Sequence, residues 1–158
     1  MSDDAIDLAL GLAPGDSLHA LRRLRPEFVA GAQACRAAVL HPAGDNGLST
    51  ALRAALGARM ARANADAVLA GQYDALTPAA FQALAQGEAQ DALPPLQASL
   101  ARHADLVTRE PAAASAADLT LLREAGLTNP QIVALSELIA FVNYQTRIAQ
   151  GLRLLGGL

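Results

Sequence analysis

The segment IVALSELIAFV, residues 132–142, constrains the fold most strongly, because it is apolar almost all round when wound as a helix. Thr128 and Pro130 precede it in the pattern of a helix start, a capping hydroxyl followed by a first-turn proline. We expect the last long helix to run from Ile132 to about Gln150. A helix with so little polar surface has to be covered by other elements on most sides. The segment therefore predicts a helix through the middle of the fold.

The composition of the remaining chain favours further helices over a sheet. Apolar residues make up 53% of the 158 residues, aromatic residues only 3%, and alanine and leucine dominate. These two are helix-forming residues, whereas strands are enriched in β-branched and aromatic side chains. We predict an all-α fold in which residues 1–158 form a single helical domain, with 1–15 as an N-terminal segment and 151–158 as a C-terminal tail.

Residues that start and stop helices divide the chain into about seven of them. The expected starts are Asp16 or Ser17, Pro26, Ser49, Thr77 with Pro78, Pro94 with Pro95, Ser115, and Thr128. Within 49–75, apolar residues recur every three or four positions, which predicts one long helix with an inward face. A weak internal repeat appears when GLS (47–49) is laid on GLT (126–128), because Asn64 then falls on Asn143. This repeat favours a pseudo-symmetric helical domain.

Charge and cysteine content exclude several classes of protein. The net charge is −3, and all 12 basic residues are arginines, set against 15 acids. The arginines are scattered except at Arg22, Arg23 and Arg25, which we interpret as a solvated helix end. A basic nucleic-acid interface is therefore disfavoured. The lone cysteine, Cys35, excludes an intrachain disulfide framework and a cysteine-based zinc site.

The sequence gives no sign of a signal peptide or a membrane span. The apolar run near the N-terminus is flanked by acids instead of bases and stops at Pro14-Gly15. No run approaches the roughly 18 uninterrupted apolar residues of a membrane helix. We expect a cytoplasmic protein with no nucleic-acid partner and no membrane partner.

Three segments carry a resemblance to a known superfamily. They are GLSTALRAALGARMARANADAVLAGQY (47–73), DLVTREPAAASAADLTLLREAGLTNPQIVALSELIAF (105–141) and FVNYQTRIAQGL (141–152), about half of the chain. On these segments the chain resembles the alkylhydroperoxidase D-like and carboxymuconolactone decarboxylase superfamily. The resemblance implies the helical domain of that superfamily and a homo-oligomer formed through its helices.

The resemblance also implies where a redox site would lie, and the residues there differ. Peroxidase members carry Cys-x-x-Cys followed by His, with a Glu earlier in the same helix. With the family's Asn placed on Asn64, the Glu position falls near Ala54, the cysteines on Asp66 and Leu69, and the His on Tyr73. Peroxide reduction by this route needs one thiolate to attack the O–O bond and a second thiol to resolve the sulfenic acid. We therefore predict a divergent member, a pseudoenzyme that lacks this chemistry.

Chemistry at a relocated site is the alternative. A lone cysteine among alanines, such as Cys35, is more often a buried apolar filler, but it could serve a peroxidase-related antioxidant enzyme. His103 could act as a base near Asp105, although two residues apart on a helix their side chains point to different sides. A decarboxylase-like enzyme would need acid-base residues including a His within 49–75, which has none. We expect no metal ion and no cofactor.

The polar residues of this region have two interpretations. Arg62, Asp66, Leu69 and Tyr73 are spaced four, three and four residues apart, so on one helix they share a face. One interpretation is an Arg62–Asp66 ion pair beside a packed Tyr73. The other is a pocket for a small ligand, with an anion held by Arg62 or Arg147. The candidate pocket residues are Arg62, Asn64, Asp66, Tyr73, Asn143 and Arg147.

The sequence suggests three functions, which we rank from the most to the least favoured. The first is a small-molecule-binding or interaction module, and the second is an enzyme of unknown chemistry that uses Asp66, Tyr73 and Arg147. The third is an antioxidant enzyme that uses Cys35 or a thiol from a partner chain. A homo-oligomer is expected because a domain so rich in alanine and leucine cannot hide every apolar face. The tail GLRLLGGL, residues 151–158, either folds back onto the core or packs on a neighbouring subunit.

Overall fold

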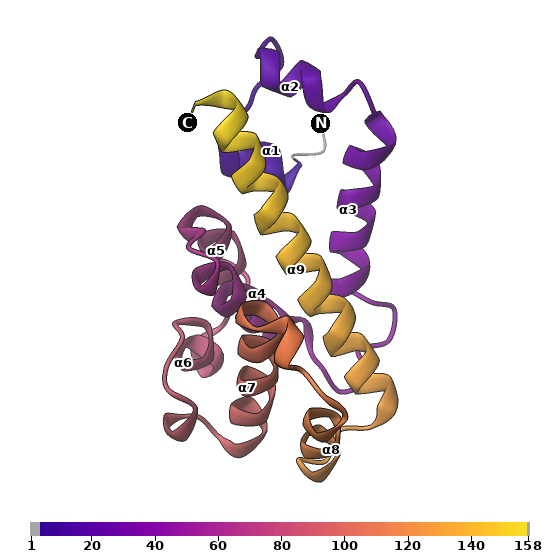
Figure 1. The fold of residues 1–158 in the computed structure, drawn as a ribbon, viewed down its shortest axis with the longest axis vertical. Helices are drawn as coiled ribbons and strands as arrows, with labels where there is room; N and C mark the ends of the chain where they lie inside the picture. The colour runs from indigo at the N-terminus through magenta and orange to yellow at the C-terminus, as the bar shows by residue number, and fades with distance from the viewer. Residues whose placement is uncertain (1–3, 158) are drawn as a thin grey trace.

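Helices make up the regular structure of the protein in a computed structural model that describes residues 4–157. Within that range there are nine α-helices, three short 3₁₀ helices and no strand (Figure 1), which confirms the predicted all-α fold. The α-helices are α1 (Ala5–Leu10), α2 (Ser17–Arg22), α3 (Pro26–Leu40), α4 (Thr50–Ala63), α5 (Ala67–Asp74), α6 (Gln82–Ala85), α7 (Pro95–Arg109), α8 (Ala116–Glu124) and α9 (Asn129–Gly156). The 3₁₀ helices are η1 (Ala79–Phe81), η2 (Gln90–Ala92) and η3 (Pro111–Ala113).

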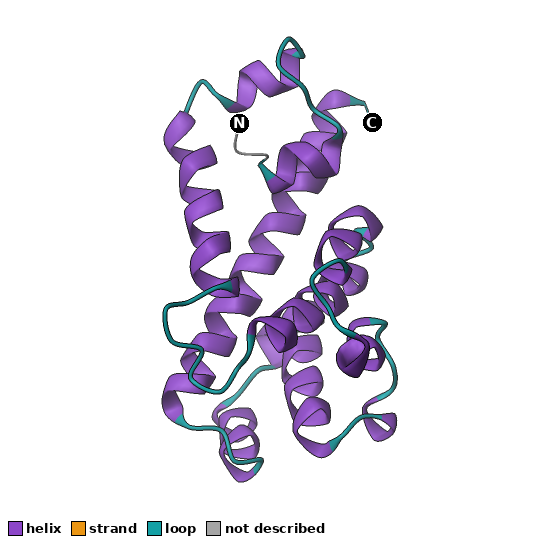
Figure 2. Ribbon diagram, turned by 180° about the vertical axis from the view of Figure 1, so that it is seen from behind, coloured by secondary structure: helices purple, strands orange, loops and turns teal. Residues whose placement is uncertain are grey.

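The central helix is α9, which extends for 28 residues and runs past Gln150. It begins as predicted, because the Thr128 side chain accepts a hydrogen bond from the backbone NH of Gln131 and Pro130 lies in the first turn. It packs against α1, α3, α4, α7 and α8, and its Leu135 is fully buried. Figures 1 and 2 show α9 along the length of the molecule, with α3 on one side and α4 to α7 on the other. The predicted long helix is confirmed, but one face of it is not covered, because Val133, Ser136, Glu137 and Ala140 within 132–142 are exposed.

The single helix predicted over 49–75 is wrong, because the chain breaks there into α4 and α5. After α4 ends at Asn64, Ala65 takes a left-handed conformation with φ 57°. Asp66 then caps α5 by accepting a hydrogen bond from the backbone NH of Leu69. Asn and Asp side chains compete with the helix for backbone groups in this way, which favours caps and turns over helix interiors. The break separates the Asp66 side chain from that of Arg62, with which it was expected to share a helix face.

Two further helix starts follow the sequence. The Ser49 hydroxyl accepts a hydrogen bond from the backbone NH of Leu52, 3.3 Å away, at the start of α4. Ser115 forms a reciprocal capping box with Asp118 at the start of α8. Both satisfy backbone NH groups that the first helical turn leaves without partners.

The N-terminal part contains a helix, α1, where only an apolar segment was expected. Asp4 caps α1, and Asp7 within it forms ion pairs with Arg22 and Arg23. Arg22 also lies 2.8 Å from Asp4, and its side chain is only 7% exposed. The predicted solvated helix end is therefore wrong for Arg22, because the acids of α1 cover it. Arg25 alone keeps the expected exposure, in an ion pair with Glu27, which is also exposed.

The core is centred on α4, in which every residue from Leu52 to Ala61 is buried. In contrast, α3 has only Ala32 and Leu40 buried along its 15 residues. This apolar helix therefore leaves most of its surface open while one edge packs against α9 and α4.

Among the helices of residues 4–157, none combines the length and the apolar character needed to cross a membrane.

Candidate functional site

The four positions at which the resemblance places a redox site are all buried. Ala54 and Leu69 have no exposed surface, and Asp66 and Tyr73 are each 1% exposed. The two polar side chains of this set are therefore held by other protein groups. What each of them binds decides whether the region can accept a ligand.

Tyr73 is locked in place by a hydrogen bond and a close backbone contact. Its hydroxyl donates to Oε1 of Gln145 on α9, 2.6 Å away. Its ring lies so close to Gly57 on α4 that a Cβ added there would be 2.7 Å from a ring carbon. Burial raises the pKa of the phenol, although the nearby Arg36 opposes the shift. Tyr73 is therefore a neutral packing residue that joins α5 to α4 and α9.

Asp66 forms a two-point ion pair with the last turns of α9. Its Oδ2 lies 2.7 Å from one nitrogen of Arg153, and its Oδ1 lies 3.1 Å from the other. The predicted Arg62–Asp66 ion pair is wrong, because the break after α4 separates these side chains. Arg62 instead binds Asp74 and donates to the carbonyl of Ala85 at 2.8 Å.

Asn64 and Asn143 join the central helix to two others. The amide of Asn64 donates to Oδ1 of Asn143 at 2.9 Å and to the hydroxyl of Thr146 at 3.1 Å. Asn143 in turn donates to the hydroxyl of Thr108 on α7, 3.1 Å away, and to the carbonyl of Ile139. Both amide hydrogens and the oxygen of Asn143 are thus used within the protein. This arrangement links α4, α7 and α9 and leaves the Asn143 side chain little capacity for a ligand.

The predicted pocket is therefore not assembled as expected. Arg62, Asp66 and Tyr73 are paired within the protein, and Asn64 with Asn143 forms a bridge between helices. Arg147 was expected to contact the region of α4 and α5, but it is exposed on α9 and has no hydrogen bond or ion pair to any described residue. Its side chain belongs to a different cavity.

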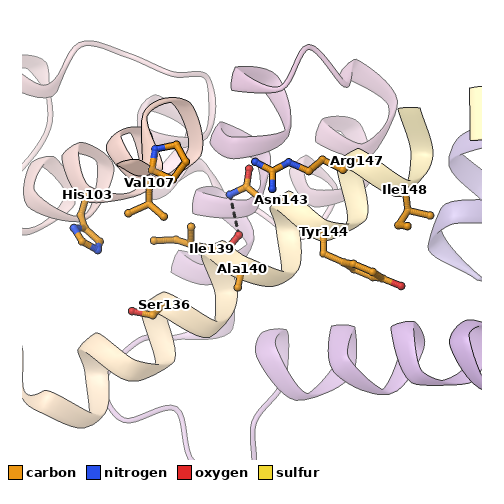
Figure 3. Close-up of a pocket in the computed structure, with 10 residues that line it drawn as sticks. His103, Val107, Ser136, Ile139, Ala140, Asn143, Tyr144, Arg147 and Ile148 are labelled. Carbon is orange, nitrogen blue, oxygen red and sulfur yellow. Dashed lines mark hydrogen bonds between the residues drawn. The ribbon is translucent and has the colours of Figure 1, made fainter. Parts of the chain in front are cut away.

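That cavity is a cleft between α7 and α9, with a volume of about 460 Å³ (Figure 3). The residues that line it are His103, Val107, Pro111, Ser136, Ile139, Ala140, Asn143, Tyr144, Arg147 and Ile148. Helical periodicity explains the set, because His103 and Val107 are four residues apart on α7 and share one face. On α9, Ser136, Ala140 and Arg147 likewise recur along one side of the helix.

His103 is the most unusual polar group of the cleft. The residue is 4% exposed, and its Nδ1 has no hydrogen-bond partner among the described residues. Leaving a buried polar atom unpaired costs about 1 to 3 kcal/mol. Burial lowers the pKa of His103 and the charge of Arg102 lowers it further, while Asp118 opposes them. The imidazole is therefore neutral at neutral pH.

Tyr144 and Arg147 complete the polar lining of the cleft. Within residues 4–157, neither the Tyr144 hydroxyl nor the Arg147 guanidinium has a hydrogen-bond partner. No acidic side chain is among the lining residues, so Arg147 carries the one formal charge of the lining at neutral pH. The cleft is thus lined by apolar walls, the cation of Arg147 and the uncharged polar side chains of His103 and Tyr144.

The sequence indicated only part of this cleft. Asn143 and Arg147 were both predicted to be pocket residues; Asn143 contacts Asn64 as expected, whereas Arg147 has no hydrogen bond or ion pair to α4 or α5. The four-residue spacing of His103 and Val107 marks one face of α7, yet spacing alone does not show that α9 lies opposite that face. The combination of His103 with Arg147 depends on the packing of α7 against α9.

A second groove lies between α3 and α9, with a volume of about 600 Å³. Cys35 lines it and is exposed, so the prediction of a buried apolar filler is wrong. The reason is that α3 packs by one edge only. The lining contains two acids, Glu27 and Glu137, and no basic residue. Across residues 4–157, no three His, Cys, Asp or Glu side chains are grouped closely enough to hold a metal ion.

Comparison with known proteins identifies the fold. No protein-family model matches the chain, and no curated protein matches it. Among solved structures, it is similar to an uncharacterized peroxidase-related protein from Silicibacter sp. TM1040, with a TM-score of 0.64 and 19% sequence identity. The match covers 92% of this chain and 77% of that one. At this level of identity, the likeness shows that the two chains share a fold.

Proposed function

We propose that this chain is a non-peroxidatic small-molecule-binding protein on an alkylhydroperoxidase D-like scaffold. The resemblance in sequence and the fold shared with a peroxidase-related protein support the scaffold. The observation that carries the proposal is the Asp66–Arg153 ion pair. At a position where the resemblance implies a redox cysteine, a buried carboxylate binds α9 and holds the fold together.

The chemistry of peroxide reduction supports the same proposal. The thiol route needs a nucleophilic thiolate and a second thiol that resolves the sulfenic acid. Asp66 and Leu69 provide neither, and the chain has one cysteine in total. That cysteine, Cys35, lies on α3 in the groove opposite the α7–α9 cleft. A relocated peroxidase would have to recruit its second thiol from another molecule.

We place the ligand site in the α7–α9 cleft. Its volume of about 460 Å³ falls within the roughly 300 to 1,000 Å³ that is typical of small-molecule pockets. Its walls are mainly apolar, and the lining includes a few polar groups without hydrogen-bond partners among the described residues. Such a lining is what a ligand pocket needs, because the apolar walls supply affinity and the polar groups supply orientation.

Blocking the cleft tests the proposal. Ser136 is exposed and lines the cleft, so Ser136→Trp fills the cavity without disturbing the core. Val133→Trp places the same side chain on the same helix at an exposed position outside the cleft. A panel of small organic molecules is screened by ligand-observed NMR. We expect binding to the wild type and to Val133→Trp, with loss of binding in Ser136→Trp. Equal binding to all three proteins would refute the cleft as the site.

We also propose that the chain forms a homo-oligomer. Helix α9 continues through Gly156, so the described part of the tail extends the helix, and Arg153 within it is paired with the buried Asp66. Leu154 and Leu155 are 85% and 72% exposed there, and Phe28 on α3 is 58% exposed. Exposed apolar side chains of this size are typical of contact surfaces when they gather in patches.

A further inference from the structure

We propose that the α7–α9 cleft binds a small organic acid, with the carboxylate paired to Arg147 and the apolar body lying against Val107 and Ile139. This inference rests on the proposed function and adds the chemical class of the ligand. Four features of the cleft support it: its charge, the freedom of its arginine, its walls and its length.

The charge of the residues that line the cleft favours an anionic ligand. Arg147 is the one charged group among the lining residues at neutral pH, since His103 is neutral and no acid is present. A cationic ligand would face an uncompensated guanidinium, whereas a monoanion would neutralise it. Electrostatic complementarity of this kind allows a site to reject one class of ligand as well as to bind another.

Arg147 is free to bind such an anion. The other arginine of α9, Arg153, is engaged with Asp66, and Arg59 of α4 is engaged with Asp105. Arg147 has no partner among the described residues, although it lines a cavity. A guanidinium presents two parallel NH groups that match the two oxygens of a carboxylate. The geometry of the side chain therefore favours a carboxylate over a spherical anion.

The walls of the cleft fit the rest of such a molecule. Figure 3 shows Val107 of α7 beside Ile139 of α9, with Ala140 on the next position of α9. Ile148 and Pro111 add further apolar surface to the lining. The apolar body of the acid leaves water when it packs against these side chains, and this burial contributes favourable free energy to binding.

The length of the cleft limits the size of the acid. Ser136 and Arg147 lie eleven residues apart on α9, which corresponds to about 16 Å along the helix axis. A short acid fits within this length, while a long-chain fatty acid would extend beyond it. His103 and Tyr144 add uncharged polar side chains to the lining.

The groove on the other side of α9 provides an internal comparison. It is also apolar and shares Ala140 and Tyr144 with the cleft, but its charged residues are Glu27 and Glu137. Glu27 is already paired with Arg25, so among the residues lining the groove Glu137 is the one that opposes an organic acid, whereas Arg147 attracts one in the cleft. The two sides of α9 should therefore distinguish an acid from a neutral molecule of the same shape.

The test uses two acids and their amides with the full-length protein. Hexanoate and phenylacetate are compared with hexanamide and phenylacetamide at pH 7.5 by titration into ¹⁵N-labelled protein and two-dimensional NMR. Arg147→Gln removes the proposed cation. Arg109→Gln removes an exposed arginine of α7 that lies outside the cleft and has no described partner. Unchanged resonances elsewhere show that each variant remains folded.

We expect at least one acid to bind the wild type, with shifts centred on residues of α7 and α9 that line the cleft. Its amide should bind at least tenfold more weakly, because a charge-assisted hydrogen bond is lost. Arg147→Gln should weaken the acid about tenfold and leave the amide unchanged, while Arg109→Gln should match the wild type.

Two results would overturn the inference, and they are distinguishable. If the amides bind the cleft as tightly as the acids and Arg147→Gln has no effect, the acid class is wrong while small-molecule binding stands. If neither acid binds, the acid class is again wrong. If in addition Ser136→Trp changes no ligand's binding in the screen described above, the proposed function fails with it.

Discussion

The hydroxyl of Tyr73 lies 2.6 Å from Oε1 of Gln145 and donates a hydrogen bond to it in the core. This bond ties α5 to the central helix at the position where the resemblance implies a catalytic histidine. The same side chain packs against Gly57 of α4. A position expected to carry chemistry is thus occupied by a group that contributes to stability, and stability measurements can show this directly.

Tyr73→Phe should destabilise the fold. The substitution leaves Oε1 of Gln145 buried without its donor, and a loss of this kind costs about 1 to 3 kcal/mol. Urea unfolding followed by circular dichroism measures the change. Tyr144→Phe is the matched control, because it removes a hydroxyl that has no partner among the described residues. Similar stability of the two variants would show that the Tyr73–Gln145 bond adds nothing.

Gly57→Ala should also be destabilising, although replacing a glycine inside a helix by alanine usually stabilises the helix. An added Cβ would lie 2.7 Å from the ring of Tyr73, and overpacking of a core costs about 1 to 3 kcal/mol. Gly71→Ala on α5 meets no atom within 4 Å, so it should stabilise the protein by about 0.5 to 1 kcal/mol. Thermal unfolding of both variants checks the prediction. A stabilised Gly57→Ala would mean that Tyr73 does not pack as described.

Asp66→Asn should lower the free energy of unfolding by about 2 to 3 kcal/mol, since it leaves the guanidinium of Arg153 without its anion. The amide oxygen can still accept the capping hydrogen bond from Leu69, so the change isolates the ion pair. Arg153→Gln and the double variant complete a mutant cycle that measures the coupling. Additive effects of the two substitutions would contradict the pairing. Arg25→Gln is the control, because its exposed pair with Glu27 should contribute little.

His103 should make the fold less stable in acid. Its pKa is lower in the folded protein than the ordinary value of 6.5, so below pH 6.5 the unfolded chain binds more protons than the folded one. Stability contributed by the neutral imidazole is therefore complete above pH 6.5 and declines as the pH falls towards and through the folded pKa. Urea unfolding at pH 7.5 and pH 5.0 should show a smaller acid loss for His103→Gln than for the wild type.

His41→Gln serves as the control for this pH dependence, because His41 is exposed at the end of α3. Its acid loss should match that of the wild type. An identical acid loss in His103→Gln and the wild type would contradict the burial of a neutral imidazole.

Truncation after Arg153 tests the proposed assembly, because it removes Leu154 and Leu155 and keeps the Asp66–Arg153 ion pair. Light scattering should show the full-length chain as an oligomer at micromolar concentration, and the truncated chain as a smaller species, because Leu154 and Leu155 are removed from an exposed helix end. A full-length monomer would refute the oligomer. An unchanged assembly after truncation would assign the interface to other surfaces.

The sequence predicted those features of the fold that depend on local chemistry. Ser49, Ser115 and Thr128 marked real helix starts, because capping acts within one turn. The all-round apolar segment identified α9 as the central helix. The break at Ala65 was missed because the apolar period continues across it, although Asn64 and Asp66 are residues that favour caps.

The site was less predictable because it depends on which helix faces which. The partners of Arg22 lie 15 and 18 residues away on α1 and at its cap, and no local pattern indicates them. His103 and Arg147 line the same cleft only because α7 packs against α9. The spacing of residues along one helix showed which side chains share a face, but the packing of a second helix decided which face encloses a cavity.

We expect this protein to lack thiol-dependent peroxidase activity, and consumption of cumene hydroperoxide in the presence of dithiothreitol tests this most directly. Wild type and Cys35→Ser are compared at equal concentration against buffer alone. We predict that neither protein accelerates peroxide loss, because Asp66 and Leu69 occupy the positions that the resemblance assigns to cysteines. Multiple turnovers by the wild type that disappear in Cys35→Ser would contradict the account.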